Sequence, residues 1–417
     1  MIFTCLKLFT CIPRVPFIEN GAIVVNRGAI LAVGTEDDVK KRFSSHRVIR
    51  LQNAVLMPGL VNLHSHLELP PLLDRVCAKT FPDWIINLIR AKQSLSNRDY
   101  QSATSININA LIQTGTTTVG EICTHGVSPA LLKQSGLRAV VFHEIINMGS
   151  GIREQERSTF KVQGSNERQT GLIRCGISPH SPYTVSEPVL RDIKMLTNKR
   201  HLRIAMHIAE SKDEIRLLQR KKNGLEEIYR LAGWDLDWAP RGDSSIEYLK
   251  GIGFLSPNLL AVHAVQVSDA DIEIINKSNV SVAHCPRSNK ETRVGKMPLK
   301  KFLDAGVIVG LGTDSLASSP SLNMWDEMRY AYQIHRRSGV SAEEIFRLAT
   351  INGAKALGLD KEIGSLEPGK KADMIAVSLP RKDTGNLYSD LLRETKSCIM
   401  SMVNGKILYR DVSEEKQ

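Results

Sequence analysis

The sequence has no cysteine pairing pattern and no long apolar run. Its seven cysteines, an odd number, are scattered along the chain without a Cys-x-x-Cys motif, which predicts reduced, mostly buried thiols rather than a disulfide framework. No uninterrupted apolar stretch reaches the roughly 20 residues that a membrane helix needs. The apolar residues 1–12 lack a basic start, are interrupted by Lys7 and alternate like a strand, so they do not indicate a signal peptide. We therefore expect a cytoplasmic protein without a membrane partner.

Acidic residues are outnumbered by basic ones, which gives a net charge of +11. Lysines and arginines are nevertheless spread along the chain, and runs such as residues 220–224 are typical of solvated helix ends. Nucleic acid is therefore not expected as a partner, while attraction of an anionic small substrate is the alternative meaning of the charge. A hydrophobic content of 42% is that of a globular protein with a sizeable core.

Eight β-rich runs follow one another through the middle of the chain, and a helical stretch follows each of them. This βα repetition predicts an α/β fold, a closed (β/α)8 barrel of the TIM type over residues 56–363. Histidine, glutamate and aspartate lie near the carboxyl ends of the runs, the face on which barrel enzymes keep their active sites. The runs cover residues 56–66, 116–123, 138–145, 173–181, 203–211, 259–265, 280–286 and 307–315.

The two chain ends have a different pattern. Residues 1–55 and 364–417 contain short alternating segments punctuated by turns such as "ENG" and "NRG". We expect them to combine into one small β-sandwich domain with a structural role.

Five side chains at predicted strand ends indicate a metal centre. His64 and His66 are two residues apart, so on a strand they point to the same face. His207, His263 and Asp314 end three other runs. Taken singly, each histidine fits a buried core residue and Asp314 fits a turn, but their convergence favours one divalent ion. Neutral imidazoles with a carboxylate suit zinc first and iron(II) second.

Several motifs in order along nearly the whole chain resemble the amidohydrolase superfamily, in its branch of aminopurine-nucleoside and related deaminases. The resemblance implies that His64, His66, His207 and Asp314 bind the metal. Two-metal members usually carry a lysine at the end of the fourth strand, where this chain has His180, so one ion per chain is expected. The motifs are "MPGLVNLHSHLE", "MHIAES", "HAVQVSD", "HCPRSN", "LGTDSLASSPSLNMWDEM", "TINGAKALGL" and "GSLEPGKKADMIAV".

The resemblance also implies the catalytic roles. Glu210 would be the proton shuttle that protonates a ring nitrogen and helps ammonia depart. The same placement fits a carboxylate that stabilises a helix N-terminus. Asp314 would accept a proton from the attacking water, and His263 would stabilise the charge that develops on the attacking oxygen.

Four further residues are expected to contact the substrate. By resemblance, His180 contacts the purine or its linkage. Glu68 follows the metal strand directly, and Trp84 lies on a long connection that is typical of a binding lid, although an aromatic at helix spacing also suits a core. Arg287 would meet a substrate anion, with a surface arginine as the alternative.

Within the branch, the motifs look closest to the aminodeoxyfutalosine deaminases, which form futalosine and ammonia on a route to menaquinone. Deaminases of S-adenosylhomocysteine or methylthioadenosine, and deaminases or chlorohydrolases of free purines or triazines, are the alternatives. A catalytically silent barrel that serves as a scaffold is the alternative of another class. The expected partner is a small nucleoside, and by analogy with the family a homo-oligomer is an option.

Overall fold

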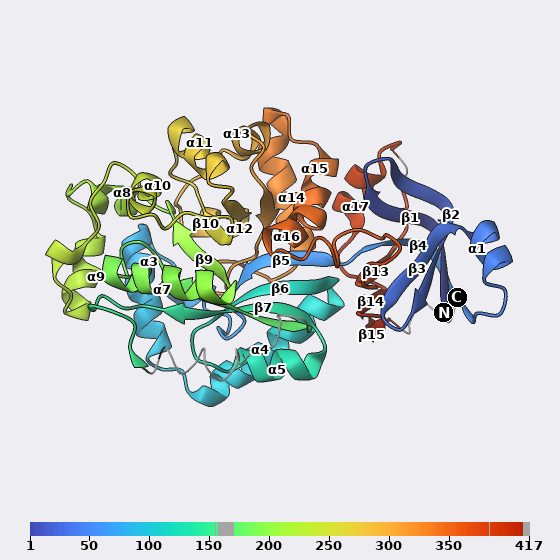
Figure 1. The fold of residues 1–417 in the computed structure, drawn as a ribbon, viewed down its shortest axis with the longest axis horizontal. Helices are drawn as coiled ribbons and strands as arrows, with labels where there is room; N and C mark the ends of the chain where they lie inside the picture. The colour runs from blue at the N-terminus through green and yellow to red at the C-terminus, as the bar shows by residue number, and fades with distance from the viewer. Residues whose placement is uncertain (155, 157–170, 383, 412–417) are drawn as a thin grey trace.

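The computed structural model describes residues 1–154, 156, 171–382 and 384–411, and its centre is a sheet of eight parallel strands (Figure 1). The sheet closes on itself because Ser65 pairs with Asp314, whose amide donates to the His64 carbonyl at 2.9 Å. This arrangement confirms the predicted barrel. In sheet order the strands are β5 (Leu60–Ser65), β6 (Thr116–Cys123), β7 (Arg138–Ile145), β8 (Ile173–Pro179), β9 (Arg203–Ile208), β10 (Leu259–His263), β11 (Ser281–His284) and β12 (Val309–Leu311).

Helices follow the strands and lie around the outside of the barrel (Figure 1). Several begin with a serine that caps the first turn, such as Ser96, Ser268 and Ser341. The helices of the barrel are α2 (Leu73–Val76), α3 (Phe81–Lys92), α4 (Asn97–Gln113), α5 (Ser128–Ser135), α7 (Glu187–Arg200), α8 (Lys212–Leu218), α9 (Leu225–Ala232), α10 (Ser245–Gly251), α11 (Asp269–Lys277), α12 (Pro286–Glu291), α13 (Leu299–Asp304), α14 (Met324–His335), α15 (Ala342–Leu348) and α16 (Ile351–Ala356).

The two chain ends build a small β unit together, as predicted. One mixed sheet of seven strands folds over so that side chains of both chain ends share an apolar core. Strand β4 belongs to this sheet as far as Pro58, past the expected boundary at residue 55; the division into two domains stays a prediction. The strands are β15 (Lys406–Arg410), β14 (Met400–Val403), β13 (Met374–Ser378), β4 (Val48–Pro58), β1 (Ile2–Ile12), β2 (Val15–Asn26) and β3 (Ala29–Thr35), with helices α1 (Glu36–Arg42) and α17 (Leu387–Glu394) beside them.

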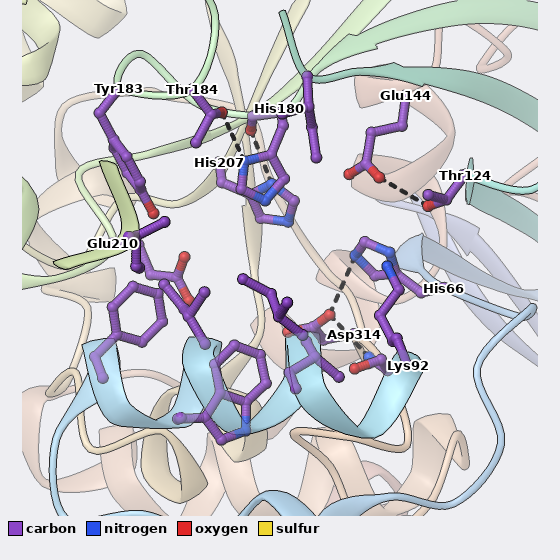
Figure 2. Close-up of a pocket in the computed structure, with 18 of the residues that line it drawn as sticks. His66, Lys92, Thr124, Glu144, His180, Tyr183, Thr184, His207, Glu210 and Asp314 are labelled. Atoms are coloured by element: carbon purple, nitrogen blue, oxygen red, sulfur yellow. Dashed lines mark hydrogen bonds and ion pairs between the residues drawn. The ribbon is translucent and has the colours of Figure 1, made fainter. Parts of the chain in front are cut away.

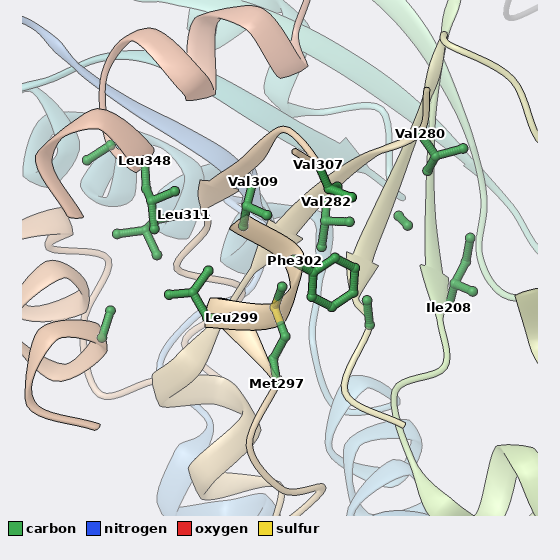
Figure 3. Packing of buried hydrophobic residues seen from close by; sticks show 14 of the residues in the cluster. Ile208, Val280, Val282, Met297, Leu299, Phe302, Val307, Val309, Leu311 and Leu348 are labelled. Carbon is green, nitrogen blue, oxygen red and sulfur yellow. The ribbon is translucent and has the colours of Figure 1, made fainter. Parts of the chain in front are cut away.

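Most of the barrel core lies between the strands and the surrounding helices. Figure 3 shows part of this layer, where Val282 of β11 and Val309 of β12 pack near Phe302 of α13. These side chains are completely buried. The β-branched strand residues and the helix residues thus fix the strands whose carboxyl ends carry the polar side chains.

All seven cysteines lie in the described part of the chain as free thiols, and Cys77 alone is exposed. The expectation of unpaired, mostly buried cysteines is therefore confirmed. Across the residues that the structure describes, no helix combines the length and the apolar character needed to cross a bilayer.

Candidate metal-dependent active site

Four of the predicted side chains, His64, His66, His207 and Asp314, converge at the carboxyl end of the barrel. Figure 2 shows the last three of them around the pocket. The Nε2 atom of His64 lies 3.2 Å from the Nε2 atoms of both His66 and His207. The Oδ1 atom of Asp314 lies 3.5 Å from Nε2 of His64 and of His66. Gly312 makes this approach feasible, because a Cβ atom there would lie only 2.9 Å from the Cβ of His64.

The protonation states of these residues fit a divalent cation. Burial lowers the pKa of His64 to about 4 and that of His66 to about 3, so both rings are neutral at pH 7 and carry lone pairs. Burial raises the pKa of Asp314, but the facing imidazoles more than offset it and hold that pKa well below its usual range. Nitrogen lone pairs and a carboxylate thus face one another at close range, which is a ligand set typical of zinc or iron(II).

His263 points its Nε2 atom between the metal ligands and Glu210. This atom is buried without a hydrogen-bond partner, 3.5 Å from Oε1 of Glu210 and 3.9 Å from Oδ2 of Asp314. Its other ring nitrogen is 2.8 Å from Oδ1 of Asn289, which fixes the orientation of the ring. The side chain is therefore placed to contact an oxygen atom of a molecule bound beside the metal ligands. It also lies close enough to His64 and Asp314 to bind the same metal ion as they do.

The carboxyl group of Glu210 lines the same pocket (Figure 2). Burial first, and then the charges of Asp314 and Glu214, raise its pKa well above the usual range. The Glu214 carboxylate accepts from the amides of Ala209 and Glu210 at 2.8 Å each and so fixes the backbone of this turn. Ser211 caps helix α8, so Glu210 itself is not the capping residue.

Two serines that sequence reasoning did not assign hold the carboxylate of Asp314. Ser288 and Ser318 donate hydroxyl hydrogen bonds to its Oδ2 atom at 2.6 and 2.9 Å. Ser288 and Asn289 are buried residues of α12, and they orient Asp314 and His263 respectively. Asp314 and His263 also have left-handed backbones, with φ of 60° and 74°, which are uncommon for residues other than glycine.

An apolar wall from helices α3 and α9 covers one side of the pocket. Trp84 is part of this wall, and its indole nitrogen donates to the Ala317 carbonyl at 3.2 Å. His180 faces the pocket beside His207, and its Nδ1 atom lies 2.8 Å from the Thr184 hydroxyl (Figure 2). Both predicted substrate residues are therefore in the pocket, and the wall also includes Leu69, Phe81, Ile85, Leu88, Ile89, Ile228 and Trp234.

The predicted substrate contact of Glu68 is wrong. Its buried carboxylate accepts hydrogen bonds from the amides of Thr124, His125, Val127 and Ser128 at 3.0, 2.6, 2.7 and 3.0 Å. These contacts turn the carboxylate away from the pocket and onto the loop after β6. Glu68 is a structural clamp for that loop.

The predicted substrate contact of Arg287 is also wrong. Its guanidinium donates to the Ser321 hydroxyl at 2.9 Å and lies 3.7 Å from Asp326 and 3.8 Å from Glu327. Arg287 is not among the residues that line the pocket. Asp326 of α14 and the hydroxyl of Ser321, which are distant from Arg287 in sequence, engage its guanidinium group.

Sequence reasoning missed a charged group on the side of the pocket away from Glu210. Glu144 is the last residue but one of β7, and its Oε2 atom accepts from the Thr124 hydroxyl at 2.8 Å (Figure 2). Burial raises the pKa of Glu144, but His180, His66 and Lys92 outweigh burial and lower it to about 2. Lys92, at the end of α3, is the one cationic lysine or arginine among the described residues that line the pocket.

Known proteins with a similar sequence or fold share this architecture. The model of the amidohydrolase family matches residues 55–408. A 5-methylthioadenosine/S-adenosylhomocysteine deaminase of Pelotomaculum thermopropionicum is 32% identical, over 95% of this chain and 92% of that protein. An adenosine deaminase of Xanthomonas campestris with bound zinc has a TM-score of 0.83 at 26% identity, over 97% and 92% of the two chains. Aminofutalosine deaminase of Helicobacter pylori, in complex with methylthio-coformycin, has a TM-score of 0.87 at 24% identity, over 97% and 99%.

Proposed function

Because the chain belongs to the amidohydrolase family, whose members are metal-dependent hydrolases, we propose that it hydrolyses the amino group of an adenine nucleoside. The products would be the hypoxanthine nucleoside and ammonia. The observation that carries this proposal is that one pocket brings together the metal-ligand set, the buried Nε2 atom of His263 that has no hydrogen-bond partner, and the buried carboxyl group of Glu210 with its raised pKa.

The proposed metal ligands are His64, His66, His207 and Asp314, with one zinc ion per chain and iron as the alternative. When bound, such an ion lowers the pKa of water toward neutrality and so supplies a nucleophile at pH 7. Zinc is supported by the related adenosine deaminase, which binds it. The absence of a lysine at the end of β8, where His180 stands, supports a single ion.

The chain's own residues would move the protons. Asp314 takes a proton from water as its oxygen adds to the amino-bearing ring carbon, while Glu210 protonates the adjacent ring nitrogen. His263 contacts the added oxygen through Nε2. Because Nδ1 gives its proton to Oδ1 of Asn289, this contact becomes a donated hydrogen bond, and stabilises the developing charge, when the ring also holds a proton on Nε2. Asp314 then passes its proton to the departing amino group, and Glu210 recovers a proton from the new hydroxyl as the carbonyl forms. The raised pKa of Glu210 favours the protonated acid that the first step needs.

As the specific substrate we propose aminodeoxyfutalosine, whose product futalosine belongs to a route to menaquinone. The apolar wall that includes Trp84 would accommodate its carboxyphenyl group, and Lys92 takes the role of carboxylate partner that the sequence had suggested for Arg287. Methylthioadenosine or S-adenosylhomocysteine is the second candidate, because the relative from Pelotomaculum thermopropionicum is named for both compounds.

Ammonia release from a panel of compounds tests both levels of the proposal. The zinc-loaded protein is assayed with aminodeoxyfutalosine, S-adenosylhomocysteine, methylthioadenosine, adenosine and guanine. We expect the highest kcat/KM with aminodeoxyfutalosine. A preference for methylthioadenosine or S-adenosylhomocysteine would overturn the named substrate and retain the deaminase. Release from guanine alone, or from none of the compounds, would overturn adenine-nucleoside deamination.

A further inference from the structure

Glu144 is a pocket carboxylate that the deamination chemistry does not use. Among the described residues, the hydroxyl of Thr124 is the one group that donates a hydrogen bond to it. An ionised carboxylate has about four acceptor sites, so most of its capacity faces the pocket. A half-buried carboxylate with unused acceptor sites is complementary to a ligand that brings hydrogen-bond donors.

The surroundings hold Glu144 in a fixed position. The amide of Thr124 donates to Oε2 of Glu68 at 3.0 Å, and the hydroxyl of the same residue donates to Glu144 at 2.8 Å. Glu68 in turn accepts from three more amides of the loop after β6. The carboxylate of Glu144 is therefore oriented by a hydrogen-bond network, anchored on the buried Glu68, before any ligand arrives, which reduces the entropy that binding must overcome.

The position of Glu144 relative to Glu210 indicates which part of a nucleoside it meets. Glu210 and Glu144 lie on opposite sides of the pocket, with His180 and His207 between them (Figure 2). In a purine nucleoside the sugar is attached to the ring edge opposite the amino-bearing carbon and its neighbouring nitrogen. With that nitrogen at Glu210, the sugar extends toward Glu144.

We propose that Glu144 binds the 2′- and 3′-hydroxyl groups of the ribose and makes this site selective for ribonucleosides. The inference rests on the proposed function. Vicinal hydroxyls present two donors side by side, which a carboxylate accepts through its two oxygens. The ammonium group of an amino-acid substituent is the competing ligand, but the charge of Lys92 already acts on Glu144 and opposes a second cation.

The test compares adenosine with 2′,3′-dideoxyadenosine in the zinc-loaded wild type and in Glu144→Gln. We expect the wild type to prefer adenosine by about 10- to 100-fold in kcat/KM, the range for hydrogen bonds to a charged group. In Glu144→Gln this preference should fall to within about 3-fold, through a higher KM for adenosine and little change for the dideoxy compound. Glu273→Gln, on exposed α11, is the matched control and should behave as the wild type does.

Three results would overturn the inference. These are an equal kcat/KM for the two nucleosides in the wild type, a preference that survives in Glu144→Gln, or an equal loss with both nucleosides. S-adenosylhomocysteine, added as a third compound, gives one further contradicting result: a loss confined to it would assign Glu144 to the ammonium group instead. If the wild type turns over neither nucleoside, their dissociation constants from calorimetry give the same comparison. Proposed deamination would then have failed, while a Glu144-dependent preference for adenosine in binding would uphold the ribose contact.

Discussion

Replacing Glu68 by alanine removes one carboxylate from beneath four backbone amides. Each amide lies between 2.6 and 3.0 Å from a carboxylate oxygen, and Glu68 is 1% exposed. A hydrogen bond to a charged group contributes roughly 1.5–3 kcal/mol, and water entering the cavity replaces part of that. We therefore expect Glu68→Ala to lower the free energy of unfolding by about 3–5 kcal/mol, which is less than the sum of four such bonds because water takes over part of them. Urea unfolding at 25 °C measures this difference.

The same change should weaken the pocket. Thr124 loses its anchor, so its contact with Glu144 loosens and kcat/KM for the nucleoside falls while the metal content stays the same. Glu68→Gln keeps one carbonyl acceptor and should lose less than alanine does. A loss below about 1 kcal/mol for Glu68→Ala would show that the four amides find other partners, and it would refute the clamp.

Three other perturbations follow from the structure. His207→Ala should leave much less than one zinc per chain by elemental analysis, and stoichiometric zinc would remove His207 from the ligand set. Arg138→Met should cost about 3–5 kcal/mol in urea unfolding, because it leaves Asp373, which Arg138 contacts at 2.7 and 3.0 Å, as an unpaired buried charge; an unchanged midpoint would contradict this. Burial raises the pKa of Glu327 to about 8, so the native state binds a proton there that the unfolded chain has already lost above about pH 5. The contribution of the protonated carboxyl group to the free energy of unfolding therefore falls as pH rises from about 5 to 8. Glu327→Gln should thus gain stability relative to the wild type by up to about 1.4 kcal/mol per pH unit in that window, and a pH-independent difference would refute the shift.

The eight strands were predictable because each has a β-rich run followed by a helical stretch, yet several strands end earlier than the pattern suggested. The run 203–211 is a strand only to Ile208, and the run 307–315 only from Val309 to Leu311. Ala209, directly after β9, has a left-handed backbone that takes the chain out of the ladder, whereas β12 ends at Leu311 and the chain returns to the sheet for one bridge at Asp314, also with a left-handed backbone. Side-chain alternation does not reveal such a turn, because it depends on the surrounding structure.

The convergence of the ligands was predictable because the carboxyl ends of parallel strands meet at one edge of the barrel. The same rule could have found Glu144, which ends the third run, but no motif drew attention to it. Glu68 and Arg287 were misassigned because their partners, the loop after β6 and the acids of α14, are brought to them only by the fold. A polar residue near a strand end is expected to have a hydrogen-bond or ion-pair partner, but the sequence does not show which residue that partner is.

The central claim is that one metal ion and the proton shuttle Glu210 together deaminate an adenine nucleoside. The most direct test is the ammonia turnover of zinc-loaded Glu210→Gln, measured on the same sample as its metal content. We predict about one zinc per chain with kcat lower by about 10²- to 10⁴-fold, the contribution of a positioned acid and base. Turnover equal to that of the wild type, or two tightly bound ions per chain, would contradict the account.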